Sequence, residues 1–256
     1  MPALNYEIRE YRDQFNSTRF RGFNVIFRET DLWIGVRQNS LKNKISDPDK
    51  PGKDGSCTNM SDIGDNSLNS TSAQNPNDWQ YPKQSCDGLT EKMKEQTIQK
   101  IKELRKTLDD YIFNEPRFSK SLTPFIPAKE APPEAVEMAD AAAKAGVGPM
   151  ASVAGLFARE AGLNLKQNFL PHELVIENGG DIFADIKDEL VLSVFAGRSP
   201  LSGKIGLVIP PDTGQVGICT SAGTVGPSLS FGQADAVVVV CKNILLADAF
   251  ATALGN

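Results

Sequence analysis

The sequence predicts an α+β or α/β sandwich, in which helices lie on a largely buried sheet. An alternating apolar pattern over residues 21–37 predicts a β-hairpin. Helical periodicity follows over residues 89–114, and two Ala-rich stretches cover 134–146 and 148–163. From residue 173 onward, short β-branched runs bounded by Gly, Pro, Asn or Asp predict strands.

The hairpin has one apolar face. Phe23, Val25 and Phe27 alternate with polar residues, and the alternation resumes at Leu32 and Ile34 after Glu29-Thr30-Asp31.

Residues 39–88 differ in composition, because they are rich in Asn, Ser, Asp, Lys, Gly and Pro and poor in aliphatic side chains. Such a segment buries too little apolar area to offset the entropy of ordering it. We therefore expect residues 1–256 to form a single domain that carries a disordered low-complexity insertion at 39–88.

Helices of different composition flank a linker. The helix over 89–114 is amphipathic and rich in Lys and Glu, which predicts a solvated outer face. The Ala-rich stretches permit close packing, and Gly146, Gly148 and Pro149 separate them, leaving the N-terminus of the second helix free to face another group.

The strands of the C-terminal half are predicted at 172–178, 189–197, 204–211 and 235–241. The last run is continuously apolar, which predicts a strand buried on both faces. A helix follows over 243–256, and its predicted buried side carries Leu245, Leu246, Ala249, Phe250 and Ala253.

Composition narrows the class of function. A net charge of −5 and a pI near 5.1 argue against a nucleic-acid partner, which would need clustered Lys and Arg. No apolar run is long enough for a membrane-spanning helix, and the first residues are charged, so we expect a cytoplasmic protein without a membrane partner. Four widely spaced cysteines without a CxxC pair predict reduced thiols.

Familiar catalytic signatures are missing from the sequence. The single histidine, His172, precedes a predicted strand without a nucleophile motif nearby, so a surface or structural role is the better interpretation. Walker A, GxGxxG and HExxH motifs are also absent.

The first candidate segment is Asn178-Gly179-Gly180-Asp181, which interrupts an apolar strand pattern. Glycine permits positive φ and removes the Cβ that would hold a ligand away from the backbone. The segment is therefore either a plain tight turn or a backbone that comes close to a ligand.

The second candidate segment is the Gly/Ser-rich stretch 219–232, which includes Thr220, Ser221 and Gly223. Backbone N–H groups and hydroxyls of such a loop can bind phosphate oxygens without net positive charge. The alternative is an ordinary surface loop.

The third candidate is the pair Asp248 and Thr252, four residues apart on the predicted terminal helix and so on one face. A carboxylate and a hydroxyl on an Ala-rich helix suit Mg²⁺, which prefers oxygen ligands and would bridge to phosphate. The alternative is simple solvation of the helix.

The order of four motifs resembles the ApbE superfamily of FAD:protein FMN transferases, and most closely its short uncharacterised prokaryotic branch. The motifs are "GVGPMASVAGLFAREAGLNL", "VIENGGDIF", "TSAG" and "ADAFATALGN", together with the "RETDL" hairpin. The resemblance implies an α+β, ApbE-like (T-fold-like) sandwich with helices packed on a largely antiparallel or mixed sheet. Members of this branch continue beyond the final "GN", so a C-terminal truncation after 256 is part of this expectation.

The same resemblance implies a site that holds FAD or FMN and Mg²⁺. The carbonyl of Val153 matches the family's backbone metal ligand, and Asp248 and Thr252 match its side-chain ligands. Gly179, Gly180 and Asp181 match the turn against the cofactor. Ala154 stands where the transferases have Lys, and the acceptor motif of those enzymes is absent.

Three functional hypotheses follow. The first is an ApbE-like protein that binds a flavin nucleotide or another pyrophosphate ligand with Mg²⁺ and transfers a phosphoryl-type group. The second is a non-catalytic or truncated family member without a functional metal site. The third is a metal-independent enzyme on a small phosphorylated metabolite, which Thr220 and Ser221 would orient. The sequence leaves the catalytic residue and the oligomeric state unknown.

Overall fold

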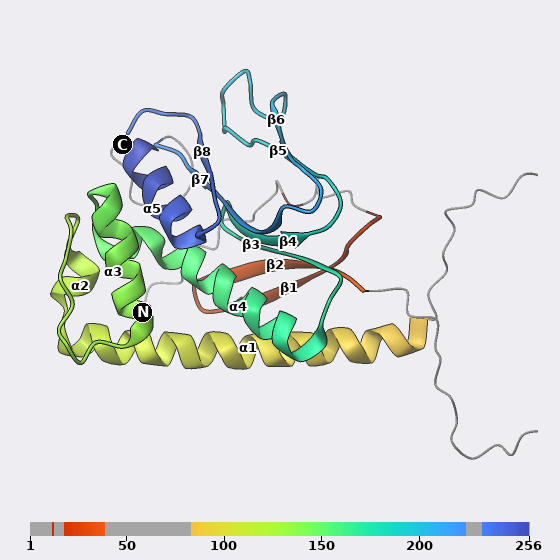
Figure 1. The fold of residues 1–256 in the computed structure, drawn as a ribbon, viewed down its shortest axis with the longest axis horizontal. Helices are drawn as coiled ribbons and strands as arrows, with labels where there is room; N and C mark the ends of the chain where they lie inside the picture. Colours follow the sequence, from red (N-terminus) through yellow and green to blue (C-terminus); the bar gives the residue numbers. More distant parts are fainter. Residues whose placement is uncertain (1–11, 13–17, 39–82, 224–231, 256) are drawn as a thin grey trace, which may run out of the picture.

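The computed structural model describes residue 12 and residues 18–38, 83–223 and 232–255. These residues form an α+β sandwich, which confirms the predicted fold class (Figure 1). The strands are β1 (Arg21–Phe27), β2 (Thr30–Arg37), β3 (Glu173–Asn178), β4 (Asp181–Ile186), β5 (Leu190–Ser193), β6 (Gly206–Ile209), β7 (Gly214–Ser221) and β8 (Val237–Cys241). The helices are α1 (Lys83–Asn114), α2 (Arg117–Lys120), α3 (Pro133–Ala145), the 3₁₀ helix η2 (Pro149–Ser152), α4 (Val153–Phe169) and α5 (Ile244–Gly255).

The main sheet has the strand order β1-β2-β3-β4-β7-β8. Strands β5 and β6 form a separate two-stranded sheet. Every strand pair in the described part of the chain is antiparallel. The hairpin predicted over 21–37 is present as β1 and β2, with Phe23, Val25, Leu32 and Ile34 buried.

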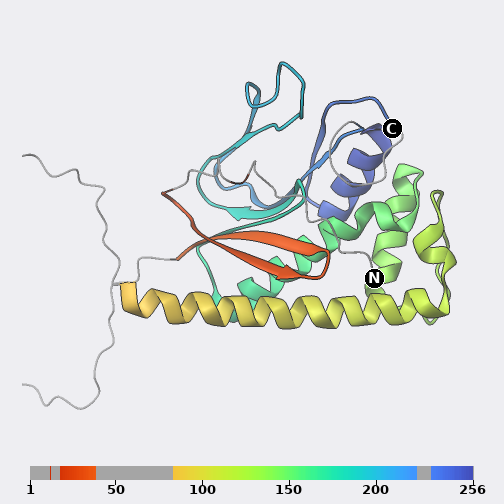
Figure 2. The same cartoon turned by 180° about the vertical axis from the view of Figure 1, so that it is seen from behind.

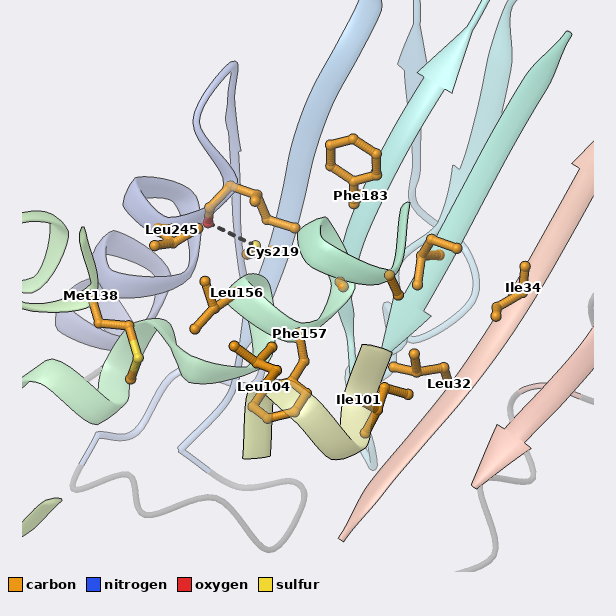
Figure 3. Close-up of a cluster of buried hydrophobic side chains, with 14 of the residues drawn as sticks. Leu32, Ile34, Ile101, Leu104, Met138, Leu156, Phe157, Phe183, Cys219 and Leu245 are labelled. Atoms are coloured by element: carbon orange, nitrogen blue, oxygen red, sulfur yellow. Dashed lines mark hydrogen bonds between the residues drawn. The ribbon is translucent and has the colours of Figure 1, made fainter. Parts of the chain in front are cut away.

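The helices cover one face of the main sheet. α1 runs along the molecule beside β1 and packs on α4, while α5 lies against β7 and β8 (Figure 2). Leu32, Ile34, Ile101, Leu156 and Leu245 all belong to the core between these layers (Figure 3). This core fixes α4 and α5 against the centre of the sheet.

The small sheet lies over the other face. Val175, Ala184 and Ile218 of the main sheet form a second apolar cluster with Leu190 of β5 and Ile209 of β6. The main sheet is therefore buried on both faces at its centre.

The start of the long helix differs from the prediction, and so does the extent of the predicted insertion. α1 begins at Lys83, inside the segment 39–88 that was predicted to be disordered. The remainder of that segment, 39–82, lies outside the described residues. α1 ends at Asn114 as expected, and the linker that follows contains the short helix α2, which the sequence did not predict.

The prediction that residues 235–241 are buried on both faces is wrong. β8 is the last strand of the sheet, none of its residues is fully buried, and 45% of Val240 is exposed. At the edge of the sheet the packed layers cover a strand less completely than at the centre, so an apolar run does not imply burial on both faces.

The predicted buried side of the terminal helix is wrong in part. Leu245 and Ala249 are buried, whereas Leu246 and Ala253 are half-buried and Phe250 is exposed. The buried side of α5 also carries Ala247, Asp248, Ala251 and Gly255.

Among the described residues, no single helix is long and apolar enough to cross a membrane. The two segments Pro133–Ala145 and Pro149–Phe169 pass the test only as a pair, and the chain bends by 101° between them.

Candidate functional site

The Gly-Gly segment forms the tight turn between β3 and β4. Asn178 pairs with Asp181 across the hairpin, and the two residues between them, Gly179 and Gly180, have φ values of 68° and 101°. Positive φ at both central positions is the requirement of a type I′ hairpin turn, which explains the two glycines. The turn is also close to β7, because the backbone N–H of Thr220 donates to the Gly180 carbonyl at 3.1 Å.

The first turn of α4 lies against both the β3–β4 turn and α5. The Asn178 side chain donates from Nδ2 to the carbonyl of Ala154 at 3.0 Å. The Gly155 backbone N–H donates to Oδ2 of Asp248 at 2.8 Å. A Cβ at Gly155 would lie 3.2 Å from the same Asp248 oxygen, so the glycine allows this close approach.

Asp181, the first residue of β4, belongs to the same cluster as Asn178, Ala154, Gly155 and Asp248. It stands directly opposite Cys219 of β7, whose thiol belongs to the core on the helix side of the sheet. The Cys219 thiol donates to the carbonyl of Ile244, at 3.6 Å from Sγ (Figure 3), and also lies within reach of the Asp181 carboxylate. Asp181 and Asp248 are therefore two carboxylates that are close enough to interact electrostatically, and both are more than nine-tenths buried.

The electrostatic environment of these carboxylates is unfavourable to negative charge. Burial raises the pKa of Asp181 well above its usual range, and the nearby Asp248 carboxylate raises it further. Burial also raises the pKa of Asp248 to about 7, although hydrogen bonds from the backbone N–H groups of Gly155 and Ala154 act in the opposite direction. Within the described residues, neither carboxylate forms an ion pair with a Lys or Arg side chain.

The Gly/Ser stretch begins as a strand rather than a loop. Thr220 and Ser221 are the last residues of β7, and Ser221 Oγ would lie 3.1 Å from a Cβ at Gly255 of α5. Gly223 donates its N–H to the carbonyl of Ala234 at 2.9 Å, so the two ends of the stretch meet. The residues between them, 224–231, lie outside the described part of the chain.

The predicted metal ligands come from α4 and α5. Val153 is the first residue of α4 and Thr252 lies one turn after Asp248 on α5, and both side chains are half-buried. No group of three or more His, Cys, Asp or Glu side chains within the described residues has the geometry of a metal site. A cation here would therefore need backbone, hydroxyl and ligand oxygens as well as carboxylates.

Such a mixed donor set fits Mg²⁺. This ion is commonly bound through one or two carboxylates together with substrate phosphates, and it retains several waters. A divalent ion beside these two buried carboxylates would favour their charged forms.

Three contributors to the cluster were not singled out by the sequence reasoning. They are Gly155, Cys219 and Glu177. The Gly155 N–H donates to the Asp248 carboxylate, and Oε1 of Glu177 accepts the Gly180 N–H at 2.8 Å. Glu177 directly precedes the Asn-Gly-Gly-Asp segment, which was the available signal. His172 lies apart from these contacts, with its backbone N–H donating to the Arg37 carbonyl at 2.8 Å.

The fold is an α+β sandwich in which the first turn of α4 contacts both the glycine hairpin turn and the buried Asp248 of α5. Comparison with known families shows to which family the chain belongs. The sequence profile of the family described as AbpE bacteria matches residues 85–256, which is more than half of the chain. The chain belongs to this family.

UPF0280 proteins are similar to part of the chain. A UPF0280 protein of Methanosphaerula palustris is 47% identical over 152 residues, covering 59% of this chain and 63% of that protein. A UPF0280 protein of Methanospirillum hungatei is 48% identical over 157 residues, covering 61% of this chain and 63% of that protein. The chain thus spans less than two thirds of the length of these relatives.

A solved structure was also found to be similar. The apo form of Pseudomonas stutzeri flavinyl transferase ApbE superposes with a TM-score of 0.39 and 12% sequence identity, over 92% of this chain and 85% of that chain.

Proposed function

We propose that this protein binds a flavin nucleotide, or another ligand that contains a pyrophosphate, through Mg²⁺ at the cluster around Asp248, and that it transfers a phosphoryl-type group. The observation that carries the proposal is that the Asp248 carboxylate accepts a hydrogen bond from Gly155 and interacts with Asp181, which directly follows the glycine turn. Membership of the AbpE bacteria family and the motif resemblance to the flavin transferases support the choice of ligand.

Each segment has a role in this proposal. Asp248, the carbonyl of Val153 and the hydroxyl of Thr252 would hold the Mg²⁺ ion. Asn178, Gly179, Gly180 and Asp181 would border the ligand on the turn side, and Thr220, Ser221 and Gly223 would supply N–H and hydroxyl donors to phosphate oxygens. When bound, the metal would supply charge stabilisation to the phosphates.

The residues of the chain would prepare the site in two ways. The hydrogen bond from Asn178 to the Ala154 carbonyl holds the turn against α4. The Gly155 and Ala154 N–H groups orient the Asp248 carboxylate at the N-terminus of α4. A carboxylate accepts about four hydrogen bonds or ligand contacts, so these two leave lone pairs for a cation.

The location and partners are part of the same proposal. We expect a cytoplasmic protein with a small-molecule nucleotide ligand, and no nucleic-acid partner because the net charge is −5.

The competing interpretation is that Asp248 only caps α4. A buried carboxylate at a helix N-terminus stabilises the helix without any ligand. Ala154 stands where the transferases have Lys, which favours a family member without transferase activity.

Calorimetric titration of FAD into the full chain, with and without Mg²⁺, tests the proposal. Asp248→Asn keeps an acceptor oxygen for the Gly155 N–H but removes the charge that a metal needs. The matched control is Asp185→Asn on β4, which pairs with Lys166 away from the cluster. We expect Mg²⁺-dependent binding in the wild type and in Asp185→Asn, and its loss in Asp248→Asn.

Two results would contradict the proposal. Absence of FAD binding in the wild type would favour the non-catalytic family member. Binding that is indifferent to Mg²⁺ and to Asp248→Asn would favour a metal-independent site.

A further inference from the structure

Two buried glutamates at the ends of β3 are each held by an arginine from the N-terminal part of the chain. Glu177, at the end next to the glycine turn, is 2% exposed. Arg12 donates from Nε to Oε2 of Glu177 at 2.6 Å. The same guanidinium donates to Oδ1 of Asp31 at 2.7 Å and to the Asp31 carbonyl at 2.8 Å. Arg12 therefore ties β3 to the β1–β2 hairpin.

The second oxygen of Glu177 continues this chain of contacts into the candidate site. Oε1 accepts the backbone N–H of Gly180 at 2.8 Å, and the Gly180 carbonyl accepts the N–H of Thr220 at 3.1 Å. Glu177 thus fixes the peptide between Gly179 and Gly180, and β7 fixes the next peptide, between Gly180 and Asp181.

The orientation of the Gly179–Gly180 peptide depends on the position of the Glu177 side chain, because Glu177 accepts its N–H. A buried carboxylate is stable in its charged form when it is paired and hydrogen-bonded. Arg12 supplies that pairing, and its planar fork contacts Glu177 and Asp31 together, which a lysine could not reproduce.

We propose that Arg12 is a positioning residue for the ligand site: it fixes Glu177, and Glu177 fixes the backbone of the Gly179-Gly180 turn against the bound ligand. This inference rests on the proposed function. Arg12 lies outside residues 85–256 that match the family profile, so the N-terminal part of the chain takes part in forming the site.

The other end of β3 provides a matched control. Glu173 is 1% exposed and is paired with Arg19, which donates from Nε to Oε2 at 2.7 Å. This ion pair has the same chemistry as that of Arg12 and Glu177 but lies at the far end of the strand from the turn. Arg19→Gln therefore removes a comparable ion pair at the end of β3 away from Gly180, while Arg37 still donates to Glu173.

The experiment compares Arg12→Gln with Arg19→Gln in the full chain. Two quantities are measured: the affinity for FAD in the presence of Mg²⁺, and the hydrogen-exchange protection of the Gly180 amide. We expect Arg12→Gln to weaken FAD binding by about tenfold or more, as for the loss of a charged hydrogen bond, and to reduce Gly180 protection. Arg19→Gln should leave affinity within about twofold of the wild type, because distant sites act independently.

Arg12→Lys separates charge from geometry. It keeps a positive charge but lacks the fork that contacts both carboxylates, so it should restore only part of the affinity and of the Gly180 protection. This variant also provides the comparison if Arg12→Gln does not fold.

Two results would overturn the inference. One is unchanged Gly180 protection in both Arg12 variants, and the other is an equal loss of FAD affinity in Arg12→Gln and Arg19→Gln. Failure of the proposed function is distinguishable, because the wild type would then not bind FAD with Mg²⁺, while Gly180 exchange would still report whether Arg12 positions the turn.

Discussion

Buried carboxylates meet opposite surroundings at the two ends of strand β3. Glu173 accepts hydrogen bonds from Arg19, Arg37 and the backbone N–H groups of Lys187 and Asp188. Burial alone would raise its pKa, but these donors outweigh burial and lower the pKa to about 2.

Beyond the glycine turn at the other end, Asp181 and Asp248 lie close together, and burial raises both pKa values. The comparison teaches that burial of a carboxylate does not by itself indicate function. Glu173 is fully compensated by its neighbours and so has a structural role. The donors around Asp181 and Asp248 do not outweigh burial, and groups with such raised pKa values concentrate at functional sites.

The largest expected effect is the loss of the compensated carboxylate. Glu173→Ala removes the carboxylate that accepts from two arginines and from the backbone N–H groups of Lys187 and Asp188. We expect the free energy of unfolding to fall by about 4 kcal/mol, as for breaking a buried ion pair by removing one partner. Urea denaturation of the wild type and variant measures this change. A loss below about 1 kcal/mol, which is typical of an exposed ion pair, would contradict the structural role.

The second prediction concerns the free energy of unfolding at acidic pH. The pKa of Glu173 is about 2 in the folded state and 4.5 in its ordinary environment. A lowered folded-state pKa stabilises the protein above the unfolded-state value, and that contribution is lost as pH falls from 4.5 towards 2. We expect a loss of about 3 kcal/mol from this group. Urea denaturation across this pH range should show the loss in the wild type and a smaller slope in Glu173→Gln.

The smallest expected effect has the opposite sign. Asp181→Asn removes a carboxyl group whose ionisation the folded state disfavours, so we expect the free energy of unfolding at neutral pH and without metal to rise by about 1 kcal/mol. The same variant should weaken Mg²⁺-dependent FAD binding, because Asp181 borders the ligand in the proposed site. Residues needed for function are commonly retained even where they destabilise the fold. A destabilised Asp181→Asn protein would show that Asp181 is compensated like Glu173.

Local patterns predicted much of the fold. The alternation over 21–37 gave the first hairpin, and the Ala-rich stretches correspond to α3 and to η2 with α4. β7 was missed because "GQVGICTS" mixes glycine with small polar residues, and its strand conformation depends on pairing with β4 rather than on local propensity.

The buried side of α5 was misjudged for a related reason. A Cβ at Gly217 of β7 would lie 2.5 Å from the Ile244 Cα, so the start of the helix packs very close to the sheet. Close packing of this kind buries the small side of a helix, and Phe250 faces outward although it is the largest apolar residue there.

The site could be predicted only in part. Asn178, Asp181 and Asp248 were chosen from the sequence, and the structure brings them together at the first turn of α4. Their ligand roles remain predictions. Arg12 and Glu177 could not be assigned a role from spacing, because their contact spans 165 positions of the sequence.

The most direct test of the central claim is to locate the metal. Crystals of the full chain grown with FAD and Mn²⁺ as a Mg²⁺ substitute would reveal the ion by anomalous scattering. The account predicts one peak at about 2.1–2.3 Å from an Asp248 carboxylate oxygen, with the FAD pyrophosphate between it and the Gly179-Gly180 turn. An ion or pyrophosphate bound elsewhere, with Asp248 contacting only the N–H groups of α4, would contradict it.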